Sequence, residues 1–297
     1  MSANPTQTVP HVRKLPTRSK AGRRVIREKI FAHTILIIVG LLFLAPFIWL
    51  VITSLKTENE IFTVPIKWWP DELQWKNYSD AISMIPFVKY TLNTILIALL
   101  SILGVVIITP MVAYGFSRID FKGRNFLFFI MMGTIMLPFQ VTMIPIYVMF
   151  NKMNLINSIW PLVLSSWFGT GIAYNVFLVR QFFMGIPHEL SESAKIDGAS
   201  EFRIYTQIIM PLAKPAVLTI GLFTFLGAWG DFQGPLIYLN DPEKWTLSIG
   251  LKQFLRENRV AWGPLMAAAT LFTIPIVILY FFVQRKFIEG ISITGMK

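Results

Sequence analysis

The sequence predicts an all-α membrane protein with six transmembrane helices. Of its 297 residues, 54% are hydrophobic and only 14% are charged, whereas a soluble domain carries about 25% charged residues. The apolar residues gather in runs of about 20 or more, the length that an α-helix needs to cross a bilayer. No single protein core could bury so many apolar side chains, so lipid must surround most of them.

The six predicted spans differ in length but all contain proline or glycine. They lie near residues 31–53, 90–116, 126–150, 158–180, 215–238 and 262–284. Proline and glycine are common in membrane helices, where they permit kinks and close helix contacts. The spans belong to one transmembrane domain, residues 30–297, which follows a basic N-terminal tail, residues 1–29. Within that domain the sequence predicts external loops at 54–89 and 239–261 and a C-terminal tail at 285–297.

The distribution of basic residues predicts the orientation. With the N-terminus in the cytoplasm, 18 of the 27 Lys and Arg residues lie on the cytoplasmic side and 9 lie outside. Cytoplasmic loops carry the excess of Lys and Arg, so both termini and the segment 187–215 are predicted to be cytoplasmic. The net charge of +11 therefore reflects membrane orientation rather than nucleic-acid binding. The absence of cysteine excludes disulfides and thiolate metal sites.

The segment 187–215 is a polar stretch between two apolar spans, and it is much longer than a turn requires. It predicts two short helices. Pro187 suits a first helical position, Gly198 suits a turn that needs positive φ, and Ser200 suits the N-cap of the second helix. Pro211 and Pro215 are expected to end that helix and to open the next apolar span. A helix of this kind at a membrane surface either lies in the interface or docks into a groove of a partner.

The same segment carries a spaced pattern. Glu192, Ser193 and Ala194 are followed after three residues by Gly198, and then after nine residues by Ile208, with Met210 and Pro211 completing it. This spacing resembles the EAA loop of ABC importer permeases, with Ser193 in place of the middle Ala and Met210 in place of Leu. The stretch from Ile196 to Ser200 resembles the sugar-importer branch of that family.

Three further stretches extend the resemblance to the maltose-type carbohydrate importers, and in particular to their second permease subunit. Residues 113–118 resemble a segment that closes the second span of sugar permeases. Residues 229–236 resemble another of their stretches, with Gly230 replacing an Asn. The last eight residues, Gly290 to Lys297, resemble the tail that reaches the ATPase in characterised members.

The resemblance implies a type I, binding-protein-dependent ABC importer permease fold in the inner membrane of a bacterium or archaeon. It implies a heterodimer with a second homologous permease, two cytoplasmic ATPase subunits that bind ATP and Mg²⁺, and an extracytoplasmic solute-binding protein. This chain itself would need no cofactor. The implied contacts with the ATPase are Glu192, Ser193, Ala194, Asp197, Gly198, Ala199 and Pro211 in the loop, and Gly295 and Lys297 in the tail.

Three observations independent of the resemblance also point to a separate ATPase. Asp231 is the one acidic or basic residue clearly within a predicted span, and transporters driven by ion gradients usually need buried ionisable groups. The sequence has no G-x4-G-K-[ST] phosphate loop. Its longest cytoplasmic loop, about 34 residues, is also too short for a nucleotide-binding domain.

The candidates for a sugar path are Asp231, Trp229, Phe225 and Asn93, although aromatic residues in spans more often pack against helices or lipid. The sequence leaves open whether this chain touches the cargo at all. One alternative function is a passive channel or membrane scaffold without ATPase coupling. An intramembrane enzyme is the other, but none of the three histidines (His11, His33, His188) lies deep in a span.

Overall fold

The computed structural model describes residues 18–256 and 259–294, and it describes side chains from 25 to 255 and from 260 to 284. The chain divides into two compact units, residues 1–50 and 51–297. The described part of the first unit is a stretch of α1 (Arg18–Ser54), a helix with Pro46 inside it. This helix begins inside the segment predicted to be a basic tail.

The second unit is almost entirely helical. The helices that form its predicted spans are α4 (Phe87–Arg118), α5 (Arg124–Gly133), η1 (Thr134–Met136), α6 (Phe139–Lys152), α7 (Trp160–Phe168), α8 (Ile172–Met184), α12 (Lys214–Gly230) and α15 (Trp262–Thr294). The polar segment forms α9 (Glu189–Ile196), α10 (Glu201–Ile204), the π-helix η2 (Tyr205–Ile209) and α11 (Met210–Leu212). The two predicted external loops hold α2 (Glu58–Ile61), α3 (Lys76–Ser83), α13 (Gln233–Tyr238), η3 (Pro242–Lys244), α14 (Leu247–Gly250), η4 (Leu251–Phe254) and the short antiparallel pair β1 (Leu255–Arg256) and β2 (Arg259–Val260).

Helix α4 is the centre of the second unit, and α7, α8 and α12 pack against it. Small residues permit the close approach. A Cβ on Gly104 would lie 2.1 Å from the indole of Trp167, and the same indole Nε1 donates a hydrogen bond of 3.0 Å to the carbonyl oxygen of Leu100. Replacing this glycine would therefore push α7 away from α4.

The prediction of six spans agrees with the helices that the described residues form. Three of these helices are long and apolar enough to cross a membrane: Val25–Ser54, Phe87–Arg118 and Trp262–Gln284. Three pairs of bent helices bring the total to six if each pair is one span. Only 11% of the most apolar stretch of α15 is buried within the chain. Such a surface requires lipid or a partner helix.

The third predicted span, 126–150, is not one helix. It breaks after Leu137, and its two halves meet at 102°. Leu137 is extended (φ −78°, ψ 115°), and Pro138 is the N-cap of α6. The residue before a proline is disfavoured in the helical region, which accounts for the position of the break. Pro145, by contrast, lies inside α6 without ending it.

The boundaries of the fourth and fifth predicted spans also differ. The fourth consists of α7 and α8, which meet at 40° across residues 169–171, and α8 runs on to Met184. The fifth was predicted as 215–238, but α12 ends at Gly230, where Asp231 becomes extended (ψ 115°) and α13 begins as a separate helix. The spanning candidate instead extends backwards from α12, through a 76° bend, to Glu201.

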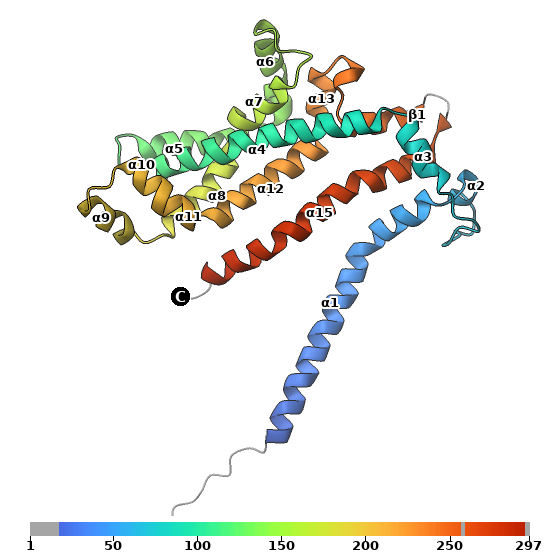
Figure 1. The fold of residues 1–297 in the computed structure, drawn as a ribbon, viewed down its shortest axis with the longest axis horizontal. Helices are drawn as coiled ribbons and strands as arrows, with labels where there is room; N and C mark the ends of the chain where they lie inside the picture. Colours follow the sequence, from blue (N-terminus) through green and yellow to red (C-terminus); the bar gives the residue numbers. More distant parts are fainter. Residues whose placement is uncertain (1–17, 257–258, 295–297) are drawn as a thin grey trace, which may run out of the picture. The chain divides into compact units, whose positions relative to one another are not determined.

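The second unit places its polar segments at opposite ends of the helices. Figure 1 shows α9 to α11 at one end of α4, α8 and α12, and α2, α3 and β1 at the other. That the segment 187–215 and the segment 54–89 lie on opposite sides of the membrane stays a prediction. At the C-terminal end of the chain, α15 continues beyond the predicted span as far as Thr294.

Candidate functional site: the segment from Pro187 to Pro215

Helix α9 ends in a complete Schellman motif. The N–H of Ala199 donates to the carbonyl oxygen of Ala194 (2.9 Å), and that of Gly198 donates to Lys195 (3.0 Å). These are the 6→1 and 5→2 bonds that satisfy the last carbonyls of a helix. Gly198 has φ +76°, the left-handed conformation that the motif requires. The predicted turn at this glycine is confirmed.

The second helix begins as predicted, but the first helix and the end of the second differ. Ser200 is the N-cap of α10, and its Oγ accepts a hydrogen bond from the N–H of Arg203. Helix α9 begins at Glu189 with His188 as its N-cap, so Pro187 precedes the helix. Pro211 does not end the second helix, because the chain passes through the π-helix η2 and continues to Leu212. Pro211 lies in the first turn of α11, where a missing N–H is tolerated.

Glu201 of α10 links this helix to α4 and to α9. Its Oε2 accepts a hydrogen bond of 2.7 Å from the hydroxyl of Tyr114 on α4. Its Oε1 forms an ion pair of 2.6 Å with Lys195 on α9. The carboxylate also lies in the first turn of α10, where the helix dipole favours an acid. Both short helices are thereby attached to the end of α4.

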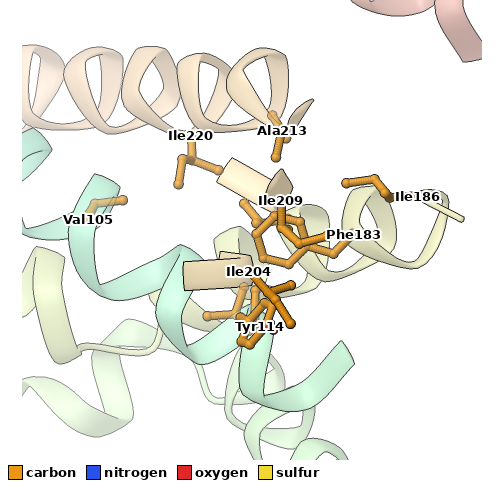
Figure 2. Close-up of a cluster of buried hydrophobic side chains, with 12 residues drawn as sticks. Val105, Tyr114, Phe183, Ile186, Ile204, Ile209, Ala213 and Ile220 are labelled. Atoms are coloured by element: carbon orange, nitrogen blue, oxygen red, sulfur yellow. The ribbon is translucent and has the colours of Figure 1, made fainter. Parts of the chain in front are cut away.

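The inner face of the segment is part of a hydrophobic core. Figure 2 shows Ile204 and Ile209 beside Tyr114 of α4 and Phe183 of α8. Both isoleucines are fully buried. Two of the predicted ATPase contacts, Ala194 and Ala199, are half-buried and pack against this same core. Their small size fits the segment onto the spans of the same chain.

The outer face of the segment is exposed and partly apolar. Ile196 is 87% exposed and Phe202 is 71% exposed. The predicted contact residues Glu192, Ser193 and Asp197 are exposed beside them. An exposed apolar patch with polar neighbours is typical of a protein–protein contact surface.

The four candidates for a sugar path all have structural roles in this conformation. Trp229 is buried, and its Nε1 donates to the carbonyl oxygen of Phe272 (3.0 Å). Phe225 is stacked on Trp229 with ring centroids 5.4 Å apart. Asn93 donates to two carbonyl oxygens of the segment 239–261, those of Glu243 and Trp245. Packing or hydrogen bonds within the chain thus hold these three side chains.

Asp231 forms the junction between α12 and α13. Its Oδ1 accepts a hydrogen bond of 3.0 Å from the N–H of Gly234, and its carbonyl oxygen accepts one from Ser248. A half-buried carboxylate needs such partners to remain charged. The acid therefore stabilises the start of α13, which accounts for its presence near the end of a span.

Two predicted contacts cannot be placed. Gly295 and Lys297 of the C-terminal tail lie outside the described residues. Within the described part of the chain, no group of three or more His, Asp or Glu side chains could hold a metal ion.

Residues 106–292 match the family described as "Binding-protein-dependent transport system inner membrane component". The chain belongs to this family. It is a multi-pass permease subunit of an ABC transporter in the cell membrane. The matched region includes the whole segment from Pro187 to Pro215.

Relatives and solved structures agree with the family. The chain is 30% identical over 256 residues to the "Probable ABC transporter permease protein YurM" of Bacillus subtilis, covering 85% of this permease and 83% of that one. It is 31% identical over 275 residues to the "Probable starch degradation products transport system permease protein AmyC" of Thermoanaerobacterium thermosulfurigenes, covering 93% and 99%. A chain from the crystal structure of a bacterial ABC transporter that imports alginate has the same fold, with a TM-score of 0.73, 24% identity and coverage of 92% and 99%.

Sequence reasoning missed the anchoring of the segment to the spans of the permease. Tyr114 lies far from Glu201 in the sequence, and no local pattern links the two. The burial of Ile209 could have been suspected, because an apolar pair at 208–209 is unusual in a solvated loop. The spacing alone could not distinguish an apolar side chain that packs inwards from one that faces a partner.

Proposed function

We propose that the outer face of the segment from Pro187 to Pro215 is the surface on which a cytoplasmic ATPase subunit acts. One observation carries this proposal. Ile204 and Ile209 fix the inner face of the segment in the core between α4 and α8, while Ile196 and Phe202 are exposed on its outer face. A force applied to the outer face is then transmitted to the spans, because packed helices move as rigid bodies.

In this proposal the permease is one subunit of a larger transporter complex. This permease pairs with a second homologous permease, and two ATPase subunits hold ATP and Mg²⁺. An extracytoplasmic protein delivers the solute. The chain itself contributes no catalytic group. The basic residues favour cytoplasmic termini, with the proposed ATPase surface on the same side.

The proposed solute is a sugar or oligosaccharide. Named relatives support this class, among them the "Diacetylchitobiose uptake system permease protein NgcG" of Streptomyces coelicolor, 27% identical over 263 residues. The test is calorimetry on the solute-binding protein that works with this permease. We expect binding of an oligosaccharide. Binding of an amino acid or a metal chelate instead would contradict the sugar class and leave the ATPase coupling untouched.

The coupling surface is tested with Ile196→Asp in the assembled transporter. A carboxylate at this position would have to be buried without a partner when the ATPase docks, which is costly. We expect the amount of co-purifying ATPase to fall by about tenfold or more. Since Ile196 is 87% exposed in the free permease, the variant should insert and fold normally.

Val64→Asp is the matched control, because Val64 is 94% exposed and belongs to the external segment. This variant should retain the ATPase in full. If Ile196→Asp also retained it and kept solute-stimulated hydrolysis, the outer face would not be the coupling surface, and a passive channel or scaffold would become the better hypothesis.

A further inference from the structure

A polar cavity of about 370 Å³ lies between α9 and the ends of α4 and α8. Its walls come from the end of α4, the start of α5, the end of α8 and the inner side of α9, with Glu201 of α10 closing it. The volume falls in the range of about 300 to 1,000 Å³ that is usual for small-molecule sites. The proposed ATPase contacts on the outer face lie elsewhere, except that Glu192 also borders this cavity.

The charged groups around the cavity are only partly paired. Its lining holds four cations (Arg118, Arg124, Arg180, Lys195), three acids (Asp120, Glu192, Glu201) and His188. Arg124 is bonded to Asp120 at 2.6 Å, and Lys195 is bonded to Glu201 at 2.6 Å. Two arginines and one glutamate remain, which leaves one surplus positive charge.

The two remaining arginines differ in how they are satisfied. The Nε of Arg180 donates to the carbonyl oxygen of Phe116 (3.1 Å), and its guanidinium lies 4.2 Å above the ring centre of Phe128. Nη2 of Arg118 donates to the carbonyl oxygens of Phe183 and Ile186 at the end of α8. Its Nε and Nη1 are buried and have no hydrogen-bond partner in the described structure.

Ser191 is a second, independent indication that this cavity holds a ligand. It lies on the inner side of α9, is 9% exposed, and lines the same cavity. Its Oγ is also buried without a partner. A buried hydroxyl and buried guanidinium nitrogens normally have partners, because leaving them unpaired is unfavourable. Here both kinds of donor belong to residues that line the same cavity.

We infer that this cavity binds a phosphoryl group, held by Arg118 and Ser191. Arginine nitrogens and a hydroxyl are strong donors to phosphate oxygens, and the surplus positive charge favours an anion. Two sources share this chemistry: the headgroup of an anionic membrane lipid, and a soluble phosphate. Basic pockets between helices near the membrane surface are suited to lipid headgroups. A bound phosphoryl group would join α9 to α4 and so stiffen the segment.

The test uses the full-length permease extracted from membranes in a mild detergent. The lipid arm adds phosphatidylglycerol and counts the retained molecules by native mass spectrometry. The soluble arm measures the melting temperature in inorganic phosphate against chloride at equal ionic strength. Ser191→Ala should reduce lipid retention or the phosphate-induced shift by roughly threefold to tenfold. Arg118→Lys should weaken binding less than Arg118→Gln, because it keeps the charge.

Lys214→Gln is the matched control, because it removes a cation from the same polar segment outside the cavity. If only the lipid is retained, the source is the membrane; if only the melting temperature responds, the source is a soluble phosphate. Ser191→Ala keeps the test valid even if both Arg118 variants fail to fold. The inference is overturned if wild type and Ser191→Ala behave alike in both arms, or if Lys214→Gln weakens binding as much as Ser191→Ala.

Discussion

Gly198 shows how one residue sets the geometry of the proposed ATPase surface. A Cβ added there would meet nothing within 4 Å, so the requirement for glycine comes from the backbone, whose φ is +76°. Gly198 is also one of the residues at which we expect contact with the ATPase subunit. The residue closes α9 and turns the chain into the cap of α10.

The first prediction separates backbone strain from charge at this position. Gly198→Ala should destabilise the turn by about 1 kcal/mol and lower coupled ATP hydrolysis moderately. Gly198→Asn should be milder, because Asn tolerates the left-handed conformation. Gly198→Asp should be as mild as Asn in its effect on folding, yet abolish coupled hydrolysis through its added charge. Equal stimulated ATPase activity for Asn and Asp variants in the assembled complex would disprove the coupling role.

Trp229 shows why the candidate sugar path could not be settled from sequence. An aromatic residue near the end of a span suits either stacking on a sugar or packing between helices. The choice depends on whether its Nε1 finds a carbonyl oxygen on a helix distant in sequence, as it does at Phe272. Local sequence contains no information on that partner.

The second prediction follows from this packing role. Trp229→Phe keeps an aromatic ring but loses volume and the hydrogen bond to Phe272. It should destabilise the permease by about 1–2 kcal/mol, seen as a lower melting temperature. The KM of the assembled transporter should not change. A tenfold higher KM with an unchanged melting temperature would instead place this residue in the sugar path.

At the scale of elements, the sequence predicted the number and type of the spans more reliably than their bends. Apolar runs identify the spans because a bilayer demands length and apolarity. Prolines mark possible breaks, yet Pro138 accompanies a 102° bend while Pro110 and Pro145 lie inside α4 and α6. The outcome depends on whether neighbouring helices can satisfy the freed carbonyl groups, which is a tertiary property.

The short helix α2 is held by a cluster around one glutamate. Glu60 forms a capping box with Thr57, and its carboxylate also accepts hydrogen bonds from the N–H of Asp71 (2.9 Å) and from Lys67 (3.0 Å). The N–H groups of Asp71 and Thr57 lower the pKa of this carboxyl from 4.5 to about 2. The segment 57–71 thus depends on a charged carboxylate.

The third prediction concerns pH. A lowered pKa stabilises the folded segment above pH 4.5, and this stabilisation is lost as the pH falls through about 2. The melting temperature of the wild type should therefore exceed that of Glu60→Gln by a constant amount above pH 5, and the difference should shrink as the pH approaches 2. Glu72→Gln, at an exposed position directly after this segment, should show no such difference. A gap that stayed constant down to pH 2 would refute the assignment.

At the scale of the whole molecule, the distribution of charged residues agrees with our proposal that the permease and its source of energy are separate polypeptides. The chain concentrates its ionisable groups at the ends of its helices, and Asp231 is occupied in holding the start of α13. A gradient-driven pump would need such groups free to bind and release ions within the spans. Our proposal accordingly assigns the free energy for accumulation to the ATPase subunits, which act through the segment that the core fixes to α4 and α8.

The fourth prediction tests that division directly. Vesicles containing the purified permease, alone or with its homologous partner, should not concentrate solute above the external level, even with a proton or sodium gradient imposed. Adding the ATPase, ATP and the loaded solute-binding protein should restore accumulation, because only then does a force act on α9 and α10. The Ile196→Asp variant should fail in this full system while Val64→Asp succeeds. Concentration of solute by the permease alone would show that the chain contains its own coupling site, and equilibration without concentration would identify it as a passive channel.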